Sequence, residues 1–143
     1  MTATLLYRIA AVVLILFAAG HTFGFLKFEP PTPEGVAVRD AMDNVQFKLG
    51  STSYTYGDFY RGLGFFCTAY MLFAAFLAWH LGSLARGNPQ AIGGLGWAFF
   101  VLQLAGIVLS WKYFVPPPAI FSAALAIVTG WAAWLVTAGS TVR

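Results

Sequence analysis

Six residues of the types that bind ligands or move protons fall near the ends of apolar segments: His21, Tyr56, Asp58, Arg61, Trp111 and Tyr113. Asp58 and Arg61 are three residues apart, so on a helix they share a face and can form an ion pair. If the apolar segments cross a membrane in turn, all six residues reach the same membrane face. We expect them to line a small-molecule pocket, because such pockets combine aromatic walls with a few polar groups.

The same six residues also suit a purely structural interpretation. A hydrated membrane interface carries a belt of Trp and Tyr side chains. Asp58 near the start of a helix would interact favourably with the positive end of the helix dipole. The sequence is therefore compatible with two alternatives. One is a small-molecule pocket, and the other is a hydrated interface that contains one ion pair.

The sequence gives little support for metal binding or redox chemistry. His21 and His80 lie at opposite ends of their segments, roughly 30 Å apart, so they cannot share a metal or haem within one chain. Cys67 is the single cysteine, which excludes an internal disulfide or a redox pair. We expect no metal and no cofactor, with ligation of a haem or chlorophyll by a single histidine as the alternative. If the protein is an enzyme, His21 or Asp58 would act as its acid or base, but no pair of residues specifies a reaction.

Two further polar residues lie inside apolar segments. Gln103 falls in the middle of one segment and Thr68 near the middle of another. A buried amide in lipid must find a hydrogen-bond partner. We expect these residues to be buried polar groups that join helices, with orientation of a deep ligand as the alternative.

The elements that position these residues are dictated by composition. Of 143 residues, 59% are apolar and only 9% are charged, against about 25% charged in a soluble domain. This excludes an ordinary soluble domain, a disordered chain and a nucleic-acid-binding module. Four stretches are long enough to cross a bilayer as helices, at about 5–25, 59–81, 95–111 and 119–138. We therefore predict an all-α integral membrane protein, a four-transmembrane-helix bundle forming one domain over residues 1–143, with both termini on the same side.

The first connection should hold an amphipathic helix at about 33–49. Thr32 can cap it, and Pro33 suits its first position. The apolar residues that then recur at helical spacing are Val38, Ala41, Met42, Val45 and Leu49. Gly50 would end the helix. Such a helix would lie in the membrane interface or cover one end of the bundle, or serve only as a lid that shields helix ends.

Four strings carry a family resemblance: 20–25 (GHTFGF), 58–64 (DFYRGLG), 77–82 (LAWHLG) and 110–119 (SWKYFVPPPA). Together they resemble a family of uncharacterised small bacterial four-span membrane proteins. That resemblance implies the bacterial inner membrane and no particular activity. Arg8 and the Gly20-His21 pair are also similar to the layout of DoxX-like proteins, another small four-span group.

Two functional hypotheses follow. The first is a protein that binds a lipid-soluble small molecule, such as a quinone, a sterol-like compound or an isoprenoid, at the loop-rich end of the bundle. The alternative is an accessory subunit of a larger membrane complex, indicated by small residues four apart such as Gly20 and Gly24. Membrane lipid, other membrane proteins or further copies of the chain are the expected partners, and nucleic acid is not.

Overall fold

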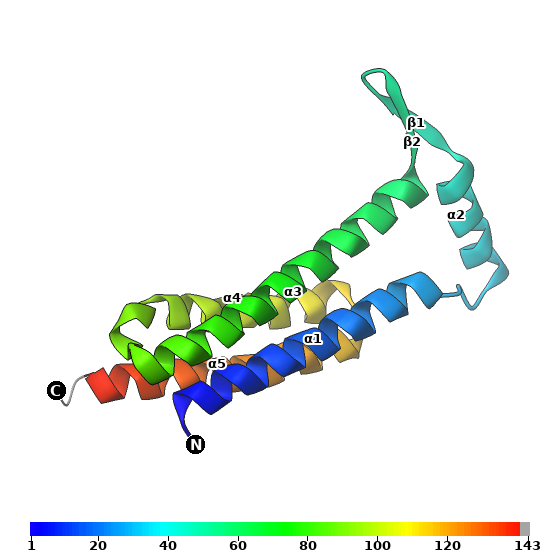
Figure 1. Ribbon diagram of the computed structural model, residues 1–143. Coiled ribbons are helices and arrows are strands. Elements are labelled where there is room, and N and C mark those ends of the chain that lie inside the picture. Colours follow the sequence, from blue (N-terminus) through cyan, green and yellow to red (C-terminus); the bar gives the residue numbers. More distant parts are fainter. Residues whose placement is uncertain (141–143) are drawn as a thin grey trace. The chain divides into compact units, whose positions relative to one another are not determined.

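The computed structural model describes residues 1–140, and these are mostly helical. The elements are α1 (Ala3–Lys27), α2 (Pro33–Asn44), β1 (Gln46–Leu49), β2 (Thr52–Thr55), α3 (Tyr56–Gly87), the 3-10 helix η1 (Pro89–Ile92), α4 (Leu95–Tyr113) and α5 (Pro116–Ser140) (Figure 1). Four of them, α1, α3, α4 and α5, are long and apolar enough to cross a membrane. The prediction of four long apolar helices is confirmed, and each contains one predicted span.

The loop helix is shorter than the predicted range of 33–49. It begins as expected, because the Thr32 side chain accepts a hydrogen bond from the Gly35 backbone N–H at 3.1 Å, but it ends at Asn44. Residues 46–49 instead form β1, which pairs antiparallel with β2. Gly50 has a φ of 62° and is the first of two turn residues, the position where a type II′ hairpin requires glycine.

The chain divides into two compact units. The first comprises Met1–Phe17 and the described part of Met71–Arg143, and the second comprises Ala18–Tyr70. The hydrophobic core lies in the first unit, where buried residues of α1, α3, η1, α4 and α5 form one cluster that includes Tyr7, Leu81, Ile92, Phe99 and Leu125. Parts of all four long helices therefore pack as a bundle in this unit.

Small residues and aromatic contacts bring the helices of the first unit together. On α5 the backbone of Gly130 lies against the Phe100 ring of α4, where a methyl group would approach the ring to 2.8 Å. Phe17 and Phe121 stack with their ring centroids 4.8 Å apart, and the Arg8 guanidinium lies 4.9 Å from the Trp79 ring centre. The buried polar residues of this unit are Gln103, Ser110, Ser122 and Thr129.

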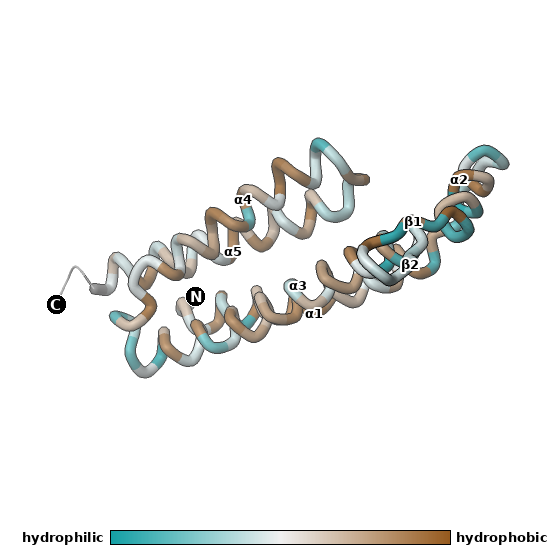
Figure 2. The backbone as a smooth tube through the Cα atoms, turned by 90° about the horizontal axis from the view of Figure 1, so that it is seen from above, coloured by the Kyte–Doolittle hydropathy of each residue, from teal (hydrophilic) through white to brown (hydrophobic). Residues whose placement is uncertain are grey.

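The surface of the long helices is unusually apolar. Large side chains remain more than half exposed on each of them, including Phe23 on α1, Phe76 on α3, Val108 on α4 and Ile127 on α5. Figure 2 shows the same contrast along the backbone: the long helices are largely brown, whereas α2 and the hairpin contain long hydrophilic stretches. The polar character of the chain is thus concentrated in the second unit.

Candidate functional site: a cavity beneath α2

A cavity of about 560 Å³ lies within the second unit. Its walls come from the end of α1 and the following loop, from α2, and from the first turns of α3. Its apolar lining includes Phe25, Phe28, Val38, Met42 and Tyr60. The volume is within the range of small-molecule sites.

Arg61 is one of three charged residues in the cavity wall, together with Arg39 and Asp43. Its Nη1 donates to Oδ1 of Asp43 on α2 at 2.8 Å, and its Nη2 donates to Oδ1 of Asp58 at 2.8 Å. Asp58 also accepts hydrogen bonds at Oδ2 from the backbone N–H and the hydroxyl of Thr55. Because the side chains of Arg61, Asp43 and Asp58 are about half exposed, these ion pairs set geometry more than they add stability.

The absence of a side chain at Gly57 makes room for the Asp43 carboxylate. A methyl group built at Gly57 would collide with Oδ1 of Asp43, and it would also lie 3.3 Å from Nη1 of Arg61. Glycine at this position is therefore what allows α2 to approach the first turn of α3 closely enough for the ion pair.

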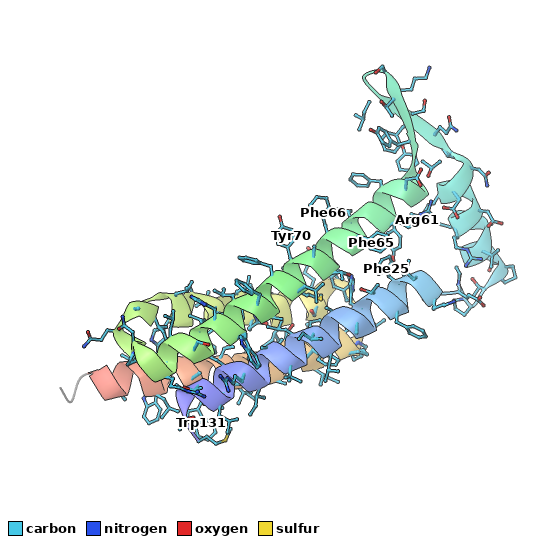
Figure 3. The ribbon with its side chains drawn as sticks, viewed as in Figure 1. Phe25, Arg61, Phe65, Phe66, Tyr70 and Trp131 are labelled. Atoms are coloured by element: carbon cyan, nitrogen blue, oxygen red, sulfur yellow. The ribbon has the colours of Figure 1, made fainter. Side chains whose placement is uncertain are left out.

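His21 lies behind the cavity wall. Its Nε2 is 3.2 Å from the carbonyl oxygen of Gly64, and a carbonyl can only accept, so Nε2 carries the hydrogen. The imidazole also packs at 5.3 Å against Phe25, which lines the cavity. In Figure 3, Phe25 and Phe65 point toward one another between α1 and α3, with ring centroids 5.3 Å apart. His21 thus supports Phe25 and does not itself line the cavity.

A pair of threonines links the two helices below His21. The hydroxyls of Thr22 and Thr68 are 2.7 Å apart, and each also lies within hydrogen-bond distance of a carbonyl oxygen of its own helix, that of Ala18 and that of Gly64 respectively. Because a hydroxyl has one hydrogen, one threonine donates across to the other, and the second donates to the carbonyl of its own helix. Thr68, which the sequence marks as a polar residue inside a span, is half-buried and joins α1 to α3.

The structure places the other sequence-predicted residues elsewhere. Tyr56 packs against Phe47 of the hairpin at 4.9 Å and does not line the cavity. Trp111 and Tyr113 end α4 in the first unit, where they are 82% and 64% exposed. Gln103 is buried in the first unit, and its amide forms no side-chain hydrogen bond within residues 1–140. Of the six predicted ligand-binding residues, Arg61 lines the cavity, while Asp58 and His21 contact residues that do.

Sequence reasoning missed several cavity residues. Val38 and Met42 belong to the predicted apolar stripe of the loop helix, and they line the cavity. Phe25, Asp43 and Tyr60 also line it, and they are not among the predicted ligand-binding residues. Helical spacing is sufficient to predict which face of α2 points inward. In contrast, nothing in the sequence links Asp43 to Arg61, which is eighteen residues away.

Comparison of the chain with protein families, curated proteins and solved structures finds no match in any of the three. Within the described residues, no group of three or more His, Cys, Asp or Glu side chains is arranged to hold a metal ion.

Proposed function

We propose that this protein is an integral membrane protein that binds a lipid-soluble small molecule in the cavity beneath α2. The observation that carries the proposal is a mainly apolar cavity lined by two arginines, of which Arg61 is already neutralised by two carboxylates. A guanidinium has five N–H donors, and the two ion pairs occupy only two nitrogens. A ligand with an apolar body and one carbonyl or hydroxyl group, such as a quinone, a sterol-like compound or an isoprenoid, suits this arrangement.

Membrane insertion is part of the same proposal. Four helices of sufficient length and apolar character support it, as do their exposed Phe, Leu, Ile and Val side chains. Such a surface would be costly in water and is favourable in lipid. We place the protein in the bacterial inner membrane with both termini on one side, following the even number of spans and the resemblance described above.

Native mass spectrometry of the protein, extracted gently from its own membrane, tests the binding proposal. The wild type should retain a stoichiometric small molecule. Arg61→Ala should lose it, whereas Arg86→Ala, at the far end of α3 in the first unit, should keep it. A wild-type chain that is consistently bare would contradict the proposal.

One observation favours the alternative, an accessory subunit of a larger membrane complex. Gly20 and Gly24 are four residues apart on α1 and exposed, and apart from the adjacent residues and the nearby backbone of α1 itself, no atom of the described residues lies within 4 Å of where a Cβ would be. Pairs of this kind allow close helix packing in membranes. Release from the membrane only together with larger protein partners, and without a small molecule, would support this function instead.

A further inference from the structure

The hairpin has one apolar face and one polar face. Antiparallel pairing sets Phe47 opposite Tyr54 and Leu49 opposite Thr52, whereas Lys48 lies opposite Ser53 and Gln46 opposite Thr55. Because successive strand residues point to opposite faces, Phe47, Leu49 and Tyr54 share a face that Lys48 does not. The rings of Phe47 and Tyr54 lie 6.2 Å apart, in agreement with this assignment.

The apolar face continues onto the first turn of α3. Phe47 contacts Tyr56 at 4.9 Å and Phe59 at 6.5 Å, measured between ring centroids. Leu49, Tyr56 and Phe59 are 62%, 50% and 59% exposed. A lone two-stranded sheet is marginally stable in water, so a sheet of this kind needs its apolar face covered.

The position of the hairpin in the chain indicates what covers it. β2 ends at Thr55 and α3 begins at Tyr56, so no linker separates the hairpin from a helix that is apolar enough to cross a bilayer. With 32 residues, α3 is roughly 48 Å long at 1.5 Å per residue, whereas the hydrocarbon core is about 30 Å thick. The helix α3 is thus long enough to extend beyond the hydrocarbon core, and the hairpin is attached directly to its N-terminal end.

We infer that the hairpin is a membrane-interface anchor whose apolar face, formed by Phe47, Leu49, Tyr54, Tyr56 and Phe59, rests in the interfacial layer of the bilayer. Lys48, on the opposite face, contacts water and lipid headgroups. Phe and Tyr on one side and Lys on the other are the side chains that this layer accommodates. The unpaired backbone groups of the strand edges limit the depth to the interface, because the hydrocarbon core offers them no hydrogen-bond partner. This inference rests on the proposed membrane insertion.

Spin labels on adjacent residues test the inference. Cys67→Ser provides a background without cysteine in the full-length protein, and Leu49→Cys and Lys48→Cys then place a label on each face of the hairpin. The protein is reconstituted into liposomes of phosphatidylcholine and phosphatidylglycerol. Collision rates are measured with oxygen, which concentrates in lipid, and with a water-soluble nickel chelate. We expect the ratio of oxygen to nickel accessibility to be severalfold higher at position 49 than at position 48.

Two outcomes overturn the inference. Equal nickel accessibility at positions 48 and 49 would place both faces in water. Protection of position 49 from both reagents would show that protein covers the face. Thr52→Cys repeats the measurement on the strand neighbour of Leu49, in case one substitution disturbs the hairpin.

A fourth label separates this inference from membrane insertion itself. Phe66 is 63% exposed and projects from α3 on the side away from Phe25 (Figure 3). A label at Phe66→Cys in lipid, together with a water-exposed label at position 49, would overturn the hairpin inference alone. A label at position 66 in water would contradict membrane insertion and with it both proposals.

Discussion

Arg61 on α3 and Asp43 on α2 are joined by a 2.8 Å ion pair across eighteen residues of chain. This bond and the close approach at Gly57 hold the inward face of α2 against the first turn of α3. The cavity proposed to bind ligand lies beneath this junction, with Asp43, Gly57 and Arg61 in its wall.

The substitution Asp43→Asn should weaken the attachment of α2 to α3 without unfolding the protein. The ion pair is exposed and contributes little to global stability, but it is the charged link between α2 and α3. Hydrogen exchange should become faster at the amides of α2, with the unfolding midpoint nearly unchanged. Asp40→Asn is the matched control on the same helix, because Asp40 takes part in no ion pair within the described residues. Equal exchange in both variants would contradict the linking role of Asp43.

Gly57→Ala should displace the Asp43 carboxylate, because the new methyl group would occupy its position. We expect loss of the retained small molecule in native mass spectrometry and faster exchange in α2. Gly62→Ala is the control on the same helix, since apart from the adjacent residues and the nearby backbone of α3, no atom of residues 1–140 lies within 4 Å of a Cβ there. That substitution should be neutral or stabilise the protein by about 0.5–1 kcal/mol, the usual difference between Ala and Gly in a helix. Retention of the ligand by Gly57→Ala would argue against the proposed wall.

The threonine pair should contribute measurably to the association of α1 with α3. Thr22→Val and Thr68→Val each remove one hydroxyl from the 2.7 Å contact. A double-mutant cycle, read from unfolding in mixed detergent, should give a coupling free energy of about 0.5–2 kcal/mol, as for other interhelical hydrogen bonds in membranes. Additive single effects would show that the two hydroxyls act independently.

Tyr7→Phe should stabilise the bundle of the first unit. Tyr7 is fully buried, and within residues 1–140 its hydroxyl has no hydrogen-bond partner. Removal of an unsatisfied buried hydroxyl should raise the free energy of unfolding by about 1–3 kcal/mol. A lower unfolding midpoint for Tyr7→Phe would mean that the hydroxyl is satisfied.

Gly96→Ala tests the same packing from the facing helix. A methyl group there would lie 2.5 Å from the Tyr7 hydroxyl oxygen, so the substitution should destabilise the wild type. In the Tyr7→Phe background the clash is removed, and Gly96→Ala should cost much less. An equal cost in both backgrounds would show that the two residues are not in contact.

The hairpin shows how local signals can compete. Val38, Met42, Val45 and Leu49 follow helical spacing, and that pattern led to a predicted helix through residue 49. The same segment also contains a strand signal, because apolar and polar residues alternate over 46–49 before the turn pair Gly50-Ser51. The structure adopts the strand, since Gly50 reaches the positive φ that the tight turn requires. Weighing the two-residue turn above the longer apolar stripe would have predicted this outcome.

The sequence by itself determined the four long apolar helices, the start of α2 at Thr32 and Pro33, and the Asp58–Arg61 pair. All of these depend on residues within a turn or a short segment of one another. Only the tertiary structure decided which residues line the cavity. It brings Asp43 to Arg61 and Phe25 to Phe65, and it assigns Trp111 and Tyr113 to the other unit. Such contacts join residues far apart in the chain, and they depend on how closely two helices approach, which helical spacing within one segment does not specify.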